Sequence, residues 1–259
     1  MRESRVIVTG ASAGIGRAIA CEFARRGARL VMSGRRAEAL EELATELRSA
    51  HAAEIEVVAG DVTDSKVRQK LLAAAESRLG GLDVLVNNAG VGAFGPFDEA
   101  EPERLRQIME VDFFATVELT RAALPLLRAG RRPAIVNIGS ILGCRGIPLA
   151  AEYCAAKFAV RGFTESLRAE LHKQGISVIL VSPGTTETGF YSNALEVRGV
   201  LPWRKSGRRG VSAEHVARRT ALAVEYNFAE IIPSCSGKLL VLANRLFPRV
   251  MHRVMRKLA

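Results

Sequence analysis

The chain has 259 residues, of which 48% are hydrophobic and 25% charged. This composition is typical of folded domains and excludes a chain that is mainly disordered. The net charge of +10 lies almost entirely at the C-terminal end, because residues 1–190 carry +1 and residues 191–259 carry +9. A nucleic-acid-binding domain is therefore not expected.

Short runs of aliphatic residues alternate with longer segments of helical periodicity. Because the short runs are apolar on both faces, they indicate a parallel sheet covered by helices on both sides. Right-handed crossovers then predict a doubly wound α/β fold in a single domain, 1–259. The expected strands are 5–9, 29–33, 54–59, 83–87, 133–139, 176–181 and 230–232, and the expected helices are 14–27, 36–50, 64–79, 102–128, 150–173 and 213–226.

The turn between the first strand and the first helix, residues 9–16, has the sequence TGASAGIG. Its glycines allow the backbone to approach a pyrophosphate, and the helix N-terminus offers free N–H groups. Glycine in a strand-to-helix turn also serves plain geometry, so this loop alone leaves both interpretations open. Ligands of such sheets bind at the carboxyl ends of the strands, where the other candidate residues should lie.

Four further motifs follow in chain order. They are Asn87-Asn88-Ala89-Gly90, then Ser140, then Tyr153 and Lys157 as Y-x-x-x-K, then Pro183-Gly184 with Thr188 as P-G-x-x-x-T. With the glycine loop, these motifs resemble the short-chain dehydrogenase/reductase family over residues 5–232. The resemblance implies a Rossmann fold of seven strands and an enzyme that interconverts alcohols with ketones or aldehydes, using a nicotinamide cofactor.

The resemblance also implies roles for single residues. Tyr153 would donate a proton to the carbonyl oxygen, Ser140 would hydrogen-bond the same oxygen, and Lys157 would hold the nicotinamide ribose. Lys157 lies one helical turn after Tyr153, and its ammonium is expected to lower the pKa of the phenol. The expected cofactor-binding residues are Gly10, Ser12, Ala13, Gly14, Ile15, Gly16, Arg35, Arg36, Asp61, Val62, Asn88, Ala89, Gly90, Tyr153, Lys157, Pro183, Gly184, Thr186 and Thr188.

The end of the second strand bears on the choice of cofactor. An acidic residue there would bind the ribose hydroxyls of NAD, but Gly34 stands where the family's NAD-dependent members usually carry Asp. The guanidinium of Arg35 can pair with a 2′-phosphate, which favours NADP(H). Asp61 and Val62 resemble the family pair that contacts adenine. Alternatively, Arg35 and Arg36 begin a solvated helix, and Asp61 caps the helix 64–79.

Asp112 departs from the family pattern, which usually has Asn at this position. That Asn completes a tetrad with Ser140, Tyr153 and Lys157, and in the family it acts largely through its backbone carbonyl. We therefore expect Asp112 to be tolerated as a fourth catalytic residue, although it adds a negative charge near Lys157. A sensor or scaffold that binds NADP(H) without catalysis is an alternative function.

The substrate is expected to be an apolar carbonyl or alcohol, such as a lipid, steroid or retinoid-like compound. Similar chains reduce β-ketoacyl thioesters, which is an alternative. Residues 189–211 form a connection long enough to close over the substrate as a lid. The expected substrate contacts are Ser140, Leu142, Tyr153, Phe190 and Tyr191, within a wall that includes Val91, Phe94, Ile141, Ile147, Leu149, Leu195 and Trp203.

Residues 237–259 are expected to form two short helices, 237–247 and one beginning at Pro248. From residue 231 onward there are six Lys and Arg but no Asp or Glu. The second helix has an apolar and a basic face, which favours peripheral contact with an anionic membrane. The alternatives are packing on the protein's own core or on a second subunit, disorder, and an acidic partner, nucleic acid included.

The remaining expectations concern assembly and location. Family members commonly pair through the helices corresponding to 102–128 and 150–173, so a homodimer or tetramer is expected. Cys21, Cys144, Cys154 and Cys235 show no disulfide or zinc spacing, which indicates reduced thiols and no metal. Apolar residues begin at position 6 without room for a signal peptide, and no run reaches the about 20 residues of a membrane span. We expect a cytoplasmic protein, with membrane association left open.

Overall fold

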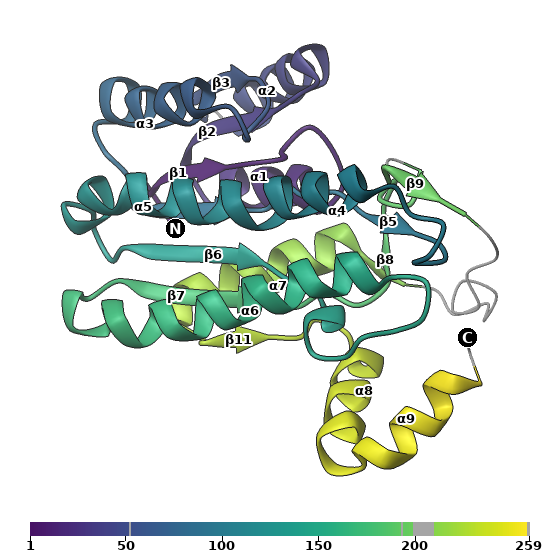
Figure 1. The fold of residues 1–259 in the computed structure, drawn as a ribbon. Coiled ribbons are helices and arrows are strands. Elements are labelled where there is room, and N and C mark those ends of the chain that lie inside the picture. The colour runs from purple at the N-terminus through teal and green to yellow at the C-terminus, as the bar shows by residue number, and fades with distance from the viewer. Residues whose placement is uncertain (52, 193, 199–209, 258–259) are drawn as a thin grey trace.

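The computed structural model describes residues 1–51, 53–192, 194–198 and 210–257. Within them, seven parallel strands form a central sheet in the order β11-β7-β6-β4-β1-β2-β3 (Figure 1). The doubly wound sheet is confirmed, and each predicted strand is present. The strands are β1 (Arg5–Val8), β2 (Arg29–Gly34), β3 (Ile55–Ala59), β4 (Val84–Asn87), β6 (Ala134–Ile138), β7 (Ser177–Val181) and β11 (Glu230–Ile231).

Helices cover both faces of this sheet. Along β1, Val6 and Val8 pack into one apolar cluster and Ile7 into the other, because successive side chains of a strand point to opposite faces. The first cluster is closed by α1 (Gly14–Arg25), α2 (Ala37–His51) and α7 (Ala213–Tyr226). The second is closed by α3 (Ser65–Leu79), α5 (Ala115–Arg128) and α6 (Ala151–Leu171).

The winding of the sheet reverses between β1 and β4, which are neighbours although they are far apart in the chain. From β1 the chain continues to β2 and β3 on one side, and then crosses to β4 and β6 on the other. A crevice opens at the carboxyl ends of the strands at such a reversal. The glycine loop after β1 and Asn88 after β4 therefore meet there.

The predicted single helix 102–128 is wrong in one respect, because a π-helical turn interrupts it. The segment consists of α4 (Pro102–Met109), the π-turn η1 (Glu110–Phe114) and α5. The extra residue of a π-turn changes the direction of the side chains that follow it. Asp112 in this turn is only 1% exposed, and its carboxylate contacts Val91 N and Lys157 Nζ.

The C-terminal residues form α8 (Cys235–Leu246) and α9 (Pro248–Arg256), a helix pair that stands out from the end of β11 (Figure 1). Two short strand pairs involve the segment between β7 and α7. They are β8 (Thr186–Glu187) with β10 (Val211–Ser212), and β5 (Ala93–Phe94) with β9 (Glu196–Val197). Among the described residues, no helix is both long and apolar enough to cross a bilayer.

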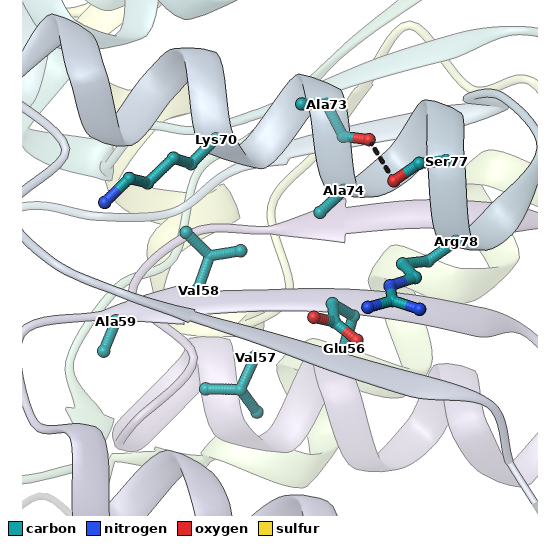
Figure 2. Close-up of a pocket in the computed structure, with 9 residues that line it drawn as sticks. All are labelled: Glu56, Val57, Val58, Ala59, Lys70, Ala73, Ala74, Ser77 and Arg78. Atoms are coloured by element: carbon teal, nitrogen blue, oxygen red, sulfur yellow. Dashed lines mark hydrogen bonds between the residues drawn. The ribbon is translucent and has the colours of Figure 1, made fainter.

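A hollow of about 410 Å³ lies at the opposite edge of the sheet, between β3 and α3 (Figure 2). Aliphatic side chains such as Val57 and Val58 line it, together with the exposed ends of Lys70 and Arg78. No residue of the sequence motifs borders this hollow. The motif residues lie instead at the carboxyl ends of the strands.

Candidate active site

The glycine loop packs so tightly that two of its positions have no room for a side chain. Gly10 has φ +64°, and a Cβ on it would lie 2.8 Å from Nδ2 of Asn88. A Cβ on Gly16 would lie 2.3 Å from the carbonyl oxygen of Gly10. Asn88 Nδ2 donates hydrogen bonds to the carbonyls of Thr9 at 2.9 Å and of Gly10 at 3.2 Å. Two motifs that are far apart in sequence thus build one backbone cradle.

The N-terminus of α1 faces this cradle with its amides available. Its N-cap, Ala13, makes no side-chain capping bond, and the first turn contains no acidic residue. Free N–H groups and the helix dipole favour an anion at such an end. A Cβ on Gly14 would lie 3.4 Å from Thr188, so the end of the P-G-x-x-x-T motif borders the same loop. These residues fit the pyrophosphate of a dinucleotide.

The carboxyl end of β2 lies beside the loop. A Cβ on Gly34 would lie 3.1 Å from Oγ of Ser12, so a larger side chain would crowd the loop. Arg36 donates to the carbonyl of Ser12 at 3.0 Å. Arg35 is exposed and has no hydrogen bond or ion pair with the described residues. The loop therefore uses Arg36 for its own structure and leaves the guanidinium of Arg35 free.

Asp61 does not cap α3, because Asp64 occupies that position and accepts a hydrogen bond from Lys66 N at 2.8 Å. Instead, Oδ1 of Asp61 accepts hydrogen bonds from the amide and hydroxyl of Thr63, at 2.9 and 2.8 Å. The neighbouring Val62 is buried. The helix-cap alternative for Asp61 is thus wrong, and the carboxylate is held in a turn after β3.

Ser140, Tyr153 and Lys157 come together at the carboxyl end of β6. Ser140 begins the 3-10 turn η2 (Ile141–Gly143), where its Oγ accepts a hydrogen bond from Leu142 N at 3.1 Å, and its side chain is hydrogen-bonded to Tyr153. Lys157 Nζ lies 5.6 Å from the centre of the Tyr153 ring and donates to the carbonyl of Ile138 at 3.2 Å. A Cβ on Gly143 would lie 2.6 Å from the carbonyl of Lys157, so η2 packs directly on α6.

Asp112 joins this group through its side chain. Its Oδ2 lies 2.9 Å from Lys157 Nζ, and its Oδ1 accepts a hydrogen bond from Val91 N at 2.7 Å. Burial raises the pKa of Asp112, against the opposing effects of Lys157 and Val91 N. The family resemblance implies action through the backbone carbonyl at this position, whereas here that carbonyl accepts a hydrogen bond from Thr116 Oγ1 at 3.2 Å.

The expectation that Lys157 lowers the pKa of Tyr153 is wrong for this arrangement. Burial, and next the negative charge of Asp112, raise the pKa of Tyr153 well above its ordinary value, while the hydrogen bond with Ser140 opposes them. The main physical reason is the burial of the phenol, and the carboxylate of Asp112, which is paired with Lys157, adds to it. Both favour the protonated phenol.

An apolar, mainly aromatic wall closes over Tyr153. The ring centres of Phe94 and Phe190 lie 5.7 and 5.6 Å from that of Tyr153, and Tyr191 lies 5.1 Å from Phe94. Leu142, Ile147 and Leu149 pack on the same cluster. These residues bury Tyr153, which is only 7% exposed.

Other expected wall residues lie elsewhere. Val91 belongs to a separate cluster with Ile108 and Ala156, and its amide serves Asp112. Ile141 points toward Gly184 and Gly237, where it would contact an added Cβ on either glycine. Leu195 is exposed. Trp203 lies outside the described residues, as does most of the expected lid.

The described part of the expected lid is tied to the body of the protein. Arg104 in α4 donates to Glu152 at 2.6 Å and is also paired with Glu196 in β9. Strand β9 itself pairs with β5 beside the aromatic wall. Whether 189–211 closes over a substrate stays a prediction.

Sequence reasoning missed Thr9 as a site residue. Its Oγ1 accepts hydrogen bonds from the amides of Asn88 and Ala89, at 2.9 and 3.0 Å, and this fixes the second motif on the first. The only available signal was its place at the start of the TGASAGIG turn. Its contact with residues 79 and 80 positions further along is invisible in the sequence.

Comparison with known proteins shows the family of the chain. A family model described as short chain dehydrogenase matches residues 4–198. The chain belongs to the short-chain dehydrogenase family. A relative is dehydrogenase/reductase SDR family member 7B of Bos taurus, 34% identical over 99% of this chain and 83% of that protein. Membership makes the chain an oxidoreductase acting on alcohol or carbonyl groups.

Two solved structures of the family resemble the chain closely. One, from Burkholderia phymatum in complex with NAD, covers 96% of this chain and 95% of its own, with TM-score 0.87 and 26% identity. The other, from Burkholderia cenocepacia in complex with NADP, covers 89% and 96%, with TM-score 0.79 and 28% identity. They support a nicotinamide cofactor for this dehydrogenase and leave open which of the two it is.

Proposed function

We propose that this short-chain dehydrogenase uses NADP(H) to interconvert an apolar ketone or aldehyde and its alcohol. The observation that carries the proposal is the meeting of Ser140, Tyr153 and Lys157 at the end of β6, beneath a wall of aromatic side chains. A phenol and a hydroxyl packed among apolar side chains suit a substrate whose reacting polar atom is the carbonyl oxygen.

Each residue of the site has its own role in the proposed reaction. The hydroxyl of Ser140 hydrogen-bonds the carbonyl oxygen and stabilises the charge that develops there. The phenol of Tyr153 donates its proton to the same oxygen in the reducing direction. Lys157 and the cradle of Gly10, Gly16 and Asn88 hold the dinucleotide, which supplies the hydride when bound.

The free guanidinium of Arg35 supports NADP(H). The end of β2 offers no carboxylate to the ribose hydroxyls, and Arg35 has no competing partner among the described residues. A guanidinium pairs well with a 2′-phosphate. Asp61 and Val62 would lie near the adenine.

The proposal also covers the oligomeric state of the protein and its location in the cell. The chain acts as one domain with residues 189–211 as its lid, and it pairs as a homodimer or tetramer. Phe114 in η1 and Phe158 in α6 are 45% and 46% exposed, and a second copy would cover them. The protein is cytoplasmic, and residues 237–259 bring it to membranes where apolar substrates reside.

The decisive experiment measures NADPH oxidation against steroid ketones, retinal, long-chain ketones and β-ketoacyl thioesters. Tyr153→Phe is assayed beside the wild type, because it removes the proton donor and keeps the ring. We expect turnover with an apolar carbonyl that disappears in the variant. Tight NADPH binding without turnover on any of these substrates would instead indicate a sensor.

A further inference from the structure

The helices α8 and α9 present an apolar surface to solvent. Its members are between 42% and 68% exposed, and we term them the tail face: Leu239, Leu242, Leu246, Phe247, Val250 and Val254. The three leucines lie on one side of α8, at spacings of three and four residues. The opposite side of α8 packs inward, where Gly237 is buried at its start. The tail face therefore needs a covering that the described residues do not supply.

A basic groove runs along another side of α9. Besides Pro248, its lining consists entirely of basic side chains, namely Arg145, Arg249, His252, Arg253 and Arg256, around a volume of about 470 Å³. The four residues of α9 share one side of the helix by their spacing. Nε of Arg145 is buried without a hydrogen-bond partner among the described residues. Such a groove suits a phosphate-type anion.

The helix pair is attached to the loop that follows the catalytic serine. Asn244 of α8 accepts a hydrogen bond from Arg145 at 3.2 Å and donates one to the carbonyl of Cys144 at 3.2 Å. Arg145 itself stands five residues after Ser140. Whatever covers the tail face thus lies next to the loop that builds one side of the active site.

We propose that the tail face and the basic groove form a docking site for a membrane that contains anionic phospholipid. The tail face enters the boundary between headgroups and acyl chains, and the groove binds a headgroup phosphate. Residues 231–257 carry six Lys and Arg but no Asp or Glu. Two copies joined through this surface would bring like charges together, whereas an anionic bilayer satisfies both the apolar and the basic parts.

This inference deepens the membrane contact within the proposed function. Its test measures binding and not turnover, so either proposal can fail alone. The full chain is sedimented with vesicles of phosphatidylcholine, and with vesicles in which about a third of the lipid is phosphatidylglycerol. We expect binding to the second kind at low salt, weakened by high salt because the groove is cationic.

Three double variants locate the contact. Arg253→Gln with Arg256→Gln removes two cations from the groove, and each cation is expected to contribute about fivefold, so binding should weaken about twenty-five-fold. Leu242→Ser with Leu246→Ser should weaken binding at least about tenfold. The matched control is Lys70→Gln with Arg78→Gln, two exposed cations beside the hollow at the far edge of the sheet (Figure 2). It should bind within about threefold of the wild type.

Several results would overturn the proposal. One is no binding of the folded full chain to the anionic vesicles at low salt. Another is an equal loss in the Lys70/Arg78 control, which would mean that only net charge matters. If the leucine variant binds like the wild type while the arginine variant does not, the groove binds soluble anions or an acidic protein. Titration with inorganic phosphate alone would then identify a free-anion site.

Discussion

Replacing Asp112 by Asn tests how the buried ion pair sets the acidity of Tyr153. Asn has nearly the same shape, and its side-chain oxygen can still accept the hydrogen bond that Val91 N donates at 2.7 Å. The change removes the carboxylate that lies 2.9 Å from Lys157 Nζ. The ammonium then acts on the phenol without a counter-charge, so we expect the pKa of Tyr153 to fall.

The size of this effect follows from the geometry. Lys157 Nζ lies 5.6 Å from the centre of the Tyr153 ring, and the carboxylate oxygen lies 2.9 Å from Nζ. The removed charge is therefore within about 8.5 Å of the ring. At an effective dielectric constant of about 20, a unit charge at that distance contributes about 2 kcal/mol, or about 1.4 pKa units.

The pH dependence of kcat/KM shows in which direction the pKa of Tyr153 has moved. Reduction requires the protonated phenol, so kcat/KM for reduction falls as the pH rises through the pKa of Tyr153. Lowering that pKa moves the fall to lower pH by about one unit or more, and the rise of the oxidation rate moves with it. Turnover in the reducing direction near pH 7 should change by less than about tenfold, or about 1.4 kcal/mol.

The assay compares kcat/KM in both directions for wild type and Asp112→Asn across about pH 6 to about pH 11. NADPH affinity and the melting temperature of each protein show that the cradle and the π-turn are intact. An alkaline limb that stays in place in an intact variant would refute the electrostatic reasoning. So would a uniform loss of several orders of magnitude, since that would make Asp112 a structural residue only.

Three further predictions address the cradle, the cofactor and the fold. Gly16→Ala should weaken NADPH binding at least about a hundredfold in a calorimetric titration, because its Cβ would lie 2.3 Å from the carbonyl oxygen of Gly10. Arg35→Asp should shift the ratio of NADPH to NADH affinity by about tenfold to a hundredfold toward NADH. If Arg35 does not contact the 2′-phosphate, this ratio should stay unchanged. Asp83→Asn should lower the free energy of unfolding in urea by about 3 kcal/mol, because the Asp83 carboxylate accepts three hydrogen bonds from Arg5.

The last of these predictions has a pH dependence with a defined sign. Burial alone would raise the pKa of Asp83, but the hydrogen bonds from Arg5 and from the amide of Arg131 hold it below its ordinary value. A lowered native pKa means that the contribution to stability is complete above the unfolded value of about 3.9. It is lost as the pH falls through the native pKa. Asp83→Asn should therefore make unfolding less sensitive to acid.

The sheet and the site motifs could be predicted from the sequence because both are local signals. Apolar runs mark buried strands, and Ser140, Tyr153 and Lys157 stand at fixed positions after them. What could not be predicted depends on contacts between distant segments. The π-turn at Asp112 is one example, since its carboxylate meets Lys157, 45 residues further along. The family resemblance places that charge near Lys157 but does not predict the direct ion pair.

The reversal of the expected pKa shift at Tyr153 has the same origin. A Tyr and a Lys on one helix face suggest an activated phenolate, and that expectation holds only if the ammonium is unpaired. Here burial of the phenol is the largest cause of the raised pKa, and the carboxylate of Asp112, where the resemblance implies an amide, raises it further. A protonated phenol is the state that reduction needs and oxidation does not.

The two unusual features of this chain, the Asp112 pair and the basic helix pair, are consistent with one direction of use. A phenol kept protonated favours delivery of a proton to a carbonyl oxygen at neutral pH. The aromatic wall around Tyr153 fits the apolar substrate of the proposed function, and Asn244 ties the proposed docking helices to the loop after Ser140. Under the proposed function, both arrangements would serve an enzyme that takes up apolar carbonyls at a bilayer and reduces them. If Asp112→Asn raises oxidation while the vesicle contact stays unchanged, the preference for reduction resides in the ion pair and not in the membrane site.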